Sequence, residues 1–283
     1  MKITVIGVGL IGGSIALKLK ATGFAAYVFG VDNNQSHLQK AKVLGIIDEI
    51  SSLEDALAAS DLIIIAIPVD ASKDVLPKIM DRIMPHQTVM DAGSTKAEIV
   101  KAVQNHPSRK RFVAFHPMWG TENSGPESAL SDSFTGRAAV ICDREHSDDD
   151  ALNTVEKVAA NLGMHVIYMS ATDHDLHTAY ISHISHITSY ALANTVLGKE
   201  REEETIFQLA STGFSSTVRL AKSHPEMWVP IFKQNRENVL DVLNEHISQL
   251  EKFKAALEQE NFGMLEGLIL NANKIRGILD KKS

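Results

Sequence analysis

The chain has 283 residues and a formal net charge of −7. That length exceeds a typical single domain and is sufficient for two hydrophobic cores. Acidic and basic residues are interspersed without a basic stripe, which argues against a nucleic-acid-binding protein. The single cysteine, Cys142, lies in an apolar run and is expected to be a buried strand thiol, so neither a disulfide nor a cysteine metal site is available.

The start of the sequence and the length of its apolar runs indicate where the protein is located in the cell. The first expected strand starts at residue 2, which leaves no room for a targeting peptide. No apolar run reaches the length that a membrane-spanning helix requires. We therefore expect a cytoplasmic protein.

The amino-terminal residues combine a strand, a glycine-rich turn and a helix. An apolar, β-branched run over 2–6 is followed by Gly7-Val8-Gly9-Leu10-Ile11-Gly12, and residues 14–20 continue with helical spacing. In this pattern the first glycine permits a tight turn, the second lets backbone N–H groups approach a pyrophosphate, and the third lets helix and strand pack closely. The helix N-terminus favours the phosphates because its N–H groups are unpaired.

A second apolar run, residues 27–31, ends at Asp32. This is about the twenty-residue spacing at which a carboxylate meets the ribose hydroxyls of a dinucleotide. A carboxylate would also repel a 2′-phosphate, so we expect NAD rather than NADP. The simpler alternative is a glycine-rich turn followed by a chance acidic residue.

The next elements extend a doubly wound sheet. Helices are expected over 36–44 and 53–59, and residues 61–67 form a run that is apolar on both faces, as in a central parallel strand. Ligands bind beyond the carboxyl ends of such strands. Ile67 and Pro68 are therefore expected to line the dinucleotide site.

Ser94 follows another expected strand. A helix over 71–84 precedes this strand at 88–91, and a helix is expected from residue 96. Ser94 therefore lies near the cofactor, either as the helix N-cap, which the local sequence favours, or as a catalytic contact.

A strand over 112–115 ends at His116, which begins a loop rich in functional groups. A histidine that faces a nicotinamide at a strand end is a natural proton acceptor for alcohol oxidation, because its pKa lies near working pH. The alternative is a histidine that only makes a hydrogen bond within the loop.

The character of the sequence changes at Ser170. Strands over 137–143 and 165–169 flank a helix over 148–162, and from Ser170 onwards the periodicity is helical. We expect an α/β protein with two domains. Residues 1–169 form a Rossmann-type doubly wound sheet that binds NAD, and residues 170–283 form an all-α domain for substrate binding and dimerisation.

The helical half contains several candidate functional side chains. A long helix over 172–196 carries His183 and His186 on one face, but no third ligand has matching spacing, so no metal is expected. Residues 212–219 read as a polar turn that enters a helix. Arg219 is either a surface charge or a bidentate clamp on a carboxylate.

The remaining helices are amphipathic. The run Glu202-Glu203-Glu204 is expected to face solvent. Segments 225–257 and 262–279 have apolar faces larger than one small helical domain needs to cover. We therefore expect a symmetric homodimer through these helices.

With these residues placed, the sequence resembles the prephenate dehydrogenase family of tyrosine biosynthesis over nearly its whole length. The matching motifs are Gly7-Val8-Gly9-Leu10-Ile11-Gly12-Gly13-Ser14, Asp91-Ala92-Gly93-Ser94-Thr95-Lys96, His116-Pro117-Met118, Gly120-Thr121-Glu122, Ser124-Gly125, His174-Asp175, Ile181-Ser182-His183 with His186, Gly213-Phe214 with Arg219, and Met227-Trp228. The combination is far more specific than any single motif.

The resemblance implies oxidative decarboxylation of prephenate to 4-hydroxyphenylpyruvate, with NAD⁺ as hydride acceptor. It also implies that His116 is the base for the ring hydroxyl, that Ser94 orients this histidine and the nicotinamide, and that Arg219 binds a substrate carboxylate. Four further residues match positions that line or gate the substrate pocket: His186, Thr121, Glu122 and Trp228.

One departure from the family pattern concerns Ser216, where many relatives have an aspartate. A carboxylate there could pair with the ammonium group of arogenate, and a serine offers less, which favours prephenate. Arogenate dehydrogenase is the nearest alternative function. A β-hydroxyacid dehydrogenase and a non-catalytic NAD(H) sensor are more distant ones.

Overall fold

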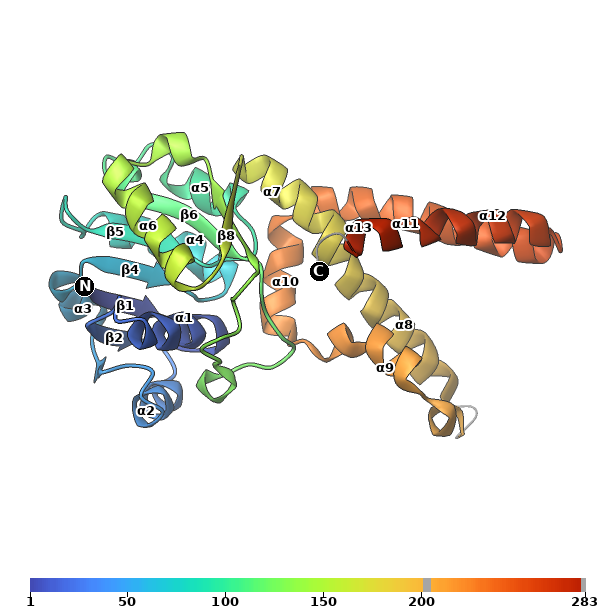
Figure 1. Ribbon diagram of the computed structural model, residues 1–283, viewed down its shortest axis with the longest axis horizontal. Coiled ribbons are helices and arrows are strands. Elements are labelled where there is room, and N and C mark those ends of the chain that lie inside the picture. The colour runs from blue at the N-terminus through green and yellow to red at the C-terminus, as the bar shows by residue number, and fades with distance from the viewer. Residues whose placement is uncertain (201–204, 281–283) are drawn as a thin grey trace. The chain divides into compact units, whose positions relative to one another are not determined.

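The structure is a computed structural model that describes residues 1–200 and 205–280, and it divides the chain into two compact units, Met1–Arg236 and Glu237–Ser283 (Figure 1). The run Glu202-Glu203-Glu204, expected to face solvent, lies outside the described residues. The expected domain boundary near residue 169 stays a prediction.

The first unit is built on one eight-stranded sheet with the order β3-β2-β1-β4-β5-β6-β7-β8. All neighbouring strands run parallel except β6 and β7, which are antiparallel. The strands are β1 (Lys2–Ile6), β2 (Tyr27–Val31), β3 (Glu49–Ile50), β4 (Leu62–Ile65), β5 (Thr88–Asp91), β6 (Phe112–Pro117), β7 (Ala138–Cys142) and β8 (His165–Met169). Of these, only the two-residue β3 was not expected from the sequence.

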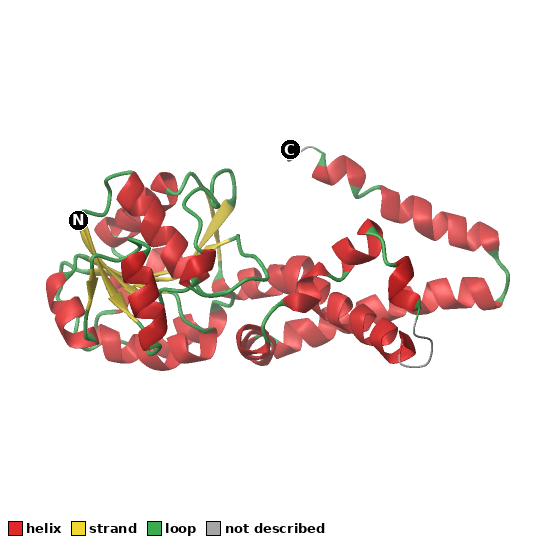
Figure 2. Ribbon diagram, turned by 90° about the horizontal axis from the view of Figure 1, so that it is seen from below, coloured by secondary structure: helices red, strands yellow, loops and turns green. Residues whose placement is uncertain are grey.

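Helices cover both faces of this sheet, as Figure 2 shows. They are α1 (Leu10–Ala21), α2 (Gln35–Val43), α3 (Leu53–Ala59), α4 (Val69–Met80), α5 (Ala97–Val103) and α6 (Asp149–Asn161). Each was expected, although α4 begins two residues earlier and ends four residues earlier than its periodicity indicated. The α/β, Rossmann-type fold class of the amino-terminal half is confirmed.

The central strand β4 explains why the sheet needs two layers of helices. Successive side chains of a strand point to opposite faces. Leu62 and Ile64 therefore belong to a core shared with α1 and α6, whereas Ile63 and Ile65 belong to a second core shared with α4 and α5. All four residues are fully buried, which accounts for the unbroken apolar run in the sequence.

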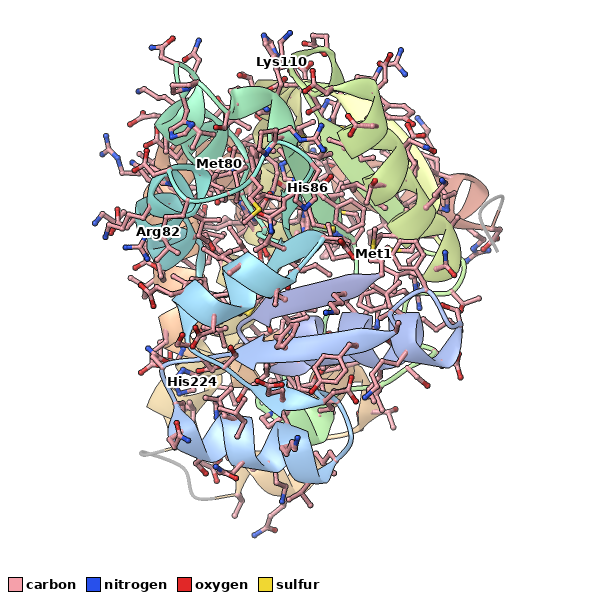
Figure 3. All side chains as sticks on the ribbon, turned by 90° about the vertical axis from the view of Figure 1, so that its left-hand side faces the viewer. Met1, Met80, Arg82, His86, Lys110 and His224 are labelled. Carbon is pink, nitrogen blue, oxygen red and sulfur yellow. The ribbon has the colours of Figure 1, made fainter. Side chains whose placement is uncertain are left out.

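The direction of the strands sets where function can lie. The strand order reverses between β1 and β4, and ligands bind outside the carboxyl ends of strands at such a switch point. The opposite end of the sheet faces the viewer in Figure 3, where Met1, His86 and Lys110 precede β1, β5 and β6. Residues expected to be functional therefore lie at the far end in that view.

The rest of the first unit is helical. α7 (Ala171–Thr178) continues through a π-helical segment (Ala179–His183) into α8 (Ile184–Glu200), so the single long helix expected here contains an interruption. Residues 212–219, expected to be a polar turn, instead form the short helix α9 (Thr212–Thr217) and the start of a 3₁₀ turn. α10 (Pro225–Gln234) packs against α4 through Trp228, Ile231 and Val69.

The second unit contains α12 (Phe262–Asn273), α13 (Arg276–Leu279) and all but the first residue of α11 (Arg236–Glu258). Many of its large apolar side chains are exposed: Leu240, Ile247, Leu250, Leu257, Phe262, Met264, Ile269, Leu270, Ile275, Ile278 and Leu279. Such a concentration of exposed apolar surface is unusual for a soluble unit without a partner. No helix of the described residues combines the length and hydropathy of a membrane span.

Candidate active site

The glycine-rich turn lies between β1 and α1, where Gly7 and Gly12 meet different constraints and Gly9 borders open space. Gly7 has φ of +92°, and its N–H donates to the Val31 carbonyl across 2.8 Å. A Cβ on Gly12 would lie 2.0 Å from the Gly7 carbonyl oxygen, so the third glycine permits the close packing of helix on strand. A Cβ on Gly9, the N-cap of α1, would meet no atom within 4 Å.

This arrangement fits a dinucleotide. The first turn of α1, which includes Leu10 and Ile11, starts beside open space at Gly9, and its backbone N–H groups have no side-chain cap. Val8 is fully buried behind the turn. Unpaired N–H groups at a helix N-terminus are suited to phosphate oxygens.

Asp32 follows β2 and is held beside the glycine turn. One carboxylate oxygen accepts a hydrogen bond from the Val8 N–H at 3.1 Å, and the other accepts one from Asn34 at 2.8 Å. The side chain is only partly exposed. The turn thus positions a fixed acceptor where a ribose is expected. From β4, the half-buried Ile67 and the exposed Pro68 follow at the adjacent strand end.

The segment after β5 is anchored by a buried ion pair. Lys96 and Asp91 are both completely buried and joined by a salt bridge, and the Lys96 ammonium also donates to the Phe115 carbonyl at 2.9 Å. Phe115 immediately precedes His116, so this lysine ties the end of β5 to the end of β6. Breaking one partner of a buried pair typically costs about 3–5 kcal/mol.

Ser94 is half-buried within this segment, but it is not the N-cap of α5, contrary to the expectation from local sequence. The first N–H groups of α5 are taken instead by the Asp175 carboxylate, which accepts from Lys96 at 2.8 Å and from Ala97 at 2.9 Å. A residue 79 positions away thus supplies the cap. No hydrogen bond of the Ser94 hydroxyl occurs within residues 1–200 and 205–280.

His116 lies at the end of β6, in antiparallel register with Val140 of β7. Its Nδ1 atom is 2.8 Å from Nε2 of His174 on α7, and Nδ1 of His174 is 2.8 Å from Oδ1 of Asp175. Loss of hydration on burial, followed by the neighbouring His174, lowers the pKa of His116 well below its usual value. His116 is therefore a neutral imidazole at neutral pH, the form that accepts a proton.

Two further histidines gather around Trp228 of α10. His186 stacks on the indole with ring centroids 3.4 Å apart, and the His183 ring meets its edge at 5.9 Å. Burial lowers the pKa of both imidazoles to about 4. These groups form a neutral aromatic wall. The described residues contain no group of three or more potential ligands arranged to hold a metal ion.

Arg219, at the start of the 3₁₀ turn, meets the loop that follows His116. Its Nη1 atom lies 3.0 Å from the Glu122 carboxylate, and about half of the arginine side chain is exposed. The Arg219 charge also contributes to the lowered pKa of His186, so the guanidinium lies near the aromatic wall. Thr121 in the same loop accepts a hydrogen bond from the Asn123 N–H at 3.2 Å.

Ser216 of α9 is turned towards its own helix. Its hydroxyl donates to the Gly213 carbonyl at 2.9 Å, and the side chain is exposed. No carboxylate occupies this position, three residues before Arg219.

Comparisons with known proteins agree with this geometry. A family model described as "Prephenate dehydrogenase, nucleotide-binding domain" matches residues 15–168, and one described as "Prephenate dehydrogenase, dimerization domain" matches residues 170–269. The chain belongs to the prephenate dehydrogenase family. The prephenate dehydrogenase of Bacillus subtilis is 32% identical over 92% of this chain and 72% of its own length.

Solved structures of the prephenate dehydrogenase family extend the comparison. The Aquifex aeolicus prephenate dehydrogenase in complex with hydroxyphenyl propionate and NAD⁺ is 32% identical, with a TM-score of 0.89 over 98% of both chains. The Synechocystis arogenate dehydrogenase is 28% identical, with a TM-score of 0.78 over 99% of this chain and 100% of its own. The family expected from the motifs is therefore confirmed.

The structure adds site groups that the sequence reasoning did not assign. His174 and Asp175 were noticed only as a matching motif, and the buried pair of Lys96 with Asp91 was not assigned a role. His174 contacts His116 across 58 positions, so no local pattern reports that contact, whereas Lys96 and Asp91 lie only five residues apart within one motif. The available signal was that these residues follow strand ends or open a helix beside His116.

Proposed function

We propose that this protein catalyses the NAD⁺-dependent oxidative decarboxylation of prephenate to 4-hydroxyphenylpyruvate. The observation that carries the proposal is the half-buried imidazole of His116 at the carboxyl end of β6, with Nδ1 engaged by His174. Its Nε2 atom makes no hydrogen bond among the described residues and is free for a substrate hydroxyl.

The roles of the other groups follow from their chemistry. Bound NAD⁺ would supply the hydride acceptor, held by the turn Gly7-Val8-Gly9-Leu10-Ile11-Gly12, by Asp32 and by the β4 end at Ile67 and Pro68. His116 takes the proton of the ring 4-hydroxyl as hydride leaves C4. When the ring carboxylate then departs as CO₂, its bonding electrons complete the aromatic ring and the oxygen recovers a proton.

The substrate side of the site is assigned to the helical elements and the loop after β6. Arg219 binds a substrate carboxylate in competition with Glu122, whose carboxylate lies 3.0 Å from its Nη1 atom. Thr121 and the stacked pair of His186 and Trp228 bound the substrate position. Ser94, with a hydroxyl unclaimed by the protein, contacts the nicotinamide or the substrate.

Prephenate is preferred over arogenate in this proposal. Arogenate carries an ammonium group, which a carboxylate beside Arg219 would recognise. The chain has Ser216 there, with its hydroxyl bonded to a backbone carbonyl. The ratio of kcat/KM for the two substrates tests this preference, and a higher value for arogenate would reverse it.

The assembly and location follow from the same proposal. The exposed apolar side chains of α11, α12 and α13 support a homodimer through the carboxyl-terminal helices. We place the boundary between an NAD-binding domain (1–169) and a helical substrate-binding and dimerisation domain (170–283) at the end of β8. The enzyme acts in the cytoplasm, where NAD⁺ is available.

The deciding experiment mixes purified protein, prephenate and NAD⁺ and follows NADH by its near-ultraviolet absorbance. NADH should form together with 4-hydroxyphenylpyruvate and CO₂ in equal amounts. Absence of NADH with prephenate, but formation with arogenate, would move the assignment to arogenate dehydrogenase.

A further inference from the structure

His116 is one end of a chain of three side chains that no solvent interrupts. His174, which contacts Nδ1 of His116 at 2.8 Å, is only 1% exposed, and Asp175, which contacts the other nitrogen of His174 at 2.8 Å, is 3% exposed. The three groups come from two separate segments, the end of β6 and the helix α7. Such a contact sequence constrains where each proton can reside.

Asp175 fixes the direction of the chain. Its Oδ1 accepts the Lys96 N–H and its Oδ2 accepts the Ala97 N–H, so both oxygens are acceptors at the N-terminus of α5. The hydrogen in the contact with His174 must therefore be on Nδ1 of the histidine. A neutral imidazole has only one N–H, which leaves Nε2 of His174 as an acceptor.

The acceptor on His174 in turn determines where His116 carries its proton. Because Nε2 of His174 accepts, Nδ1 of His116 must donate to it across 2.8 Å. The lone pair of His116 is then on Nε2, the atom that makes no hydrogen bond among the described residues. The contacts with His174 and Asp175 thus fix the tautomer of His116, with the lone pair on Nε2.

We propose that His174, backed by Asp175, is a positioning residue that fixes His116 in the tautomer with Nδ1 protonated and Nε2 bare, and that takes up the charge when His116 accepts a proton. The second part of this inference rests on the proposed function. The tautomer itself does not depend on the identity of the substrate.

The charges around the chain support the direction of proton flow. His116 faces His174 on α7, the Lys96 ammonium before α5 and His183 of the π segment, and all three oppose a positive charge on it. Burial lowers the pKa of His174 as well, but this imidazole has the Asp175 carboxylate directly on its Nδ1, and Asp91 also favours its charged form while Lys96 opposes it. A cation is therefore better accommodated on His174 than on His116.

The proton balance of the reaction is closed by this chain. The hydroxyl proton moves to Nε2 of His116, and the Nδ1 proton moves to Nε2 of His174, which becomes an imidazolium against Asp175. Bound NAD⁺ would accept the hydride that leaves C4 with its electron pair. As the carbon–carbon bond to CO₂ breaks, the electron pair completes the ring, and the proton movements reverse to give the phenol.

The test uses His174→Leu, which removes the acceptor, and His174→Gln, whose amide oxygen can accept from His116 but cannot take a proton. The exposed His177 of the same helix provides the matched control, His177→Leu. Thermal unfolding and NAD⁺ affinity report whether each variant keeps its fold.

The first readout is the ¹⁵N NMR spectrum of the full chain with labelled histidine, recorded without prephenate and assigned with His116→Asn. The wild type should show His116 with Nδ1–H and a bare Nε2. This tautomer should persist in His174→Gln and give way to a mixture in His174→Leu. A wild-type His116 that carries its proton on Nε2 would overturn the proposal.

The second readout is kinetic. We expect His174→Leu to lower kcat by about 10²–10⁴-fold, the range in which a general base and its tautomer control fall, with KM for both substrates within about threefold. His174→Gln should recover the tautomer but only part of kcat, and His177→Leu should match the wild type. A kcat of His174→Leu within about threefold of wild type would refute the positioning role.

These readouts separate the two proposals. If the wild type fails to oxidise prephenate, the proposed function is wrong, while the NMR spectrum still decides the tautomer. If His174→Leu does not fold, the wild-type spectrum together with His174→Gln gives the same decision.

Discussion

Replacing His116 with asparagine tests the proposed base with little disturbance of its surroundings. The asparagine amide nitrogen lies about where Nδ1 of histidine does, so it can still donate to His174, which is 2.8 Å from Nδ1 in the structure. Asparagine has no atom at the position of Nε2. The substitution therefore removes the proton acceptor and keeps the internal hydrogen bond.

A positioned general base contributes about 10²–10⁴-fold, or roughly 3–5 kcal/mol of activation free energy. We expect kcat of His116→Asn to fall by this factor, and NAD⁺ affinity to stay within about twofold because His116 lies on β6, away from the glycine turn. Initial rates of NADH formation at saturating substrates measure kcat, and calorimetric titration measures NAD⁺ binding.

The control is His86→Asn, an exposed histidine at the opposite end of the sheet (Figure 3). It should leave both quantities unchanged. If His116→Asn retained near wild-type kcat, the imidazole would not be the base, and the proton would have to leave by another route.

Three further predictions concern other parts of the structure. Arg219→Ala should raise KM for prephenate by about 10–100-fold through loss of a charged hydrogen bond worth roughly 1.5–3 kcal/mol, while the exposed Arg82→Ala should not; equal KM values would return Arg219 to a surface role. Asp32→Asn should raise KM for NAD⁺ and lower the ratio of kcat/KM with NAD⁺ to kcat/KM with NADP⁺, which steady-state kinetics with both cofactors measure. If this ratio were unchanged, Asp32 would not contact the ribose. His183 and His186 have pKa values of about 4 in the folded protein, so between about pH 6.5 and 4 the unfolded chain binds protons more readily than the folded one. The free energy of unfolding, measured by urea titration, should therefore fall as pH falls across this window, by at most about 1.4 kcal/mol per pH unit for each histidine. A free energy of unfolding that does not change with pH would show that neither histidine is buried as a neutral ring.

The parts of the fold that the sequence predicted are those encoded over short distances. Gly7 and Gly12 could be interpreted from their spacing because the constraints on them come from β1, α1 and the neighbouring β4. The apolar run of β4 indicated a strand buried on both faces for the same reason. The nucleotide-binding fold and the family followed from these local signals and from the motifs, and both are confirmed.

The sequence predictions failed where a residue distant in the chain makes a contact that a local residue was expected to make. Ser94 has the residue type and position of an N-cap, yet Asp175 satisfies the first N–H groups of α5. The contact of His116 with His174 likewise joins residues 58 positions apart. Helical periodicity could not reveal the π segment either, because its five residues are apolar and polar in an ordinary helical mixture.

The π segment holds one residue more than regular α turns need for the same rotation about the helix axis. Each residue of an α-helix advances the chain by about 100°, so four α-helical residues would turn roughly as far as the five residues of Ala179–His183. Deleting one residue there should restore regular turns and leave His186 on the face that stacks on Trp228. A missing codon would then shorten the helix and move only the side chains of the segment itself, His183 among them.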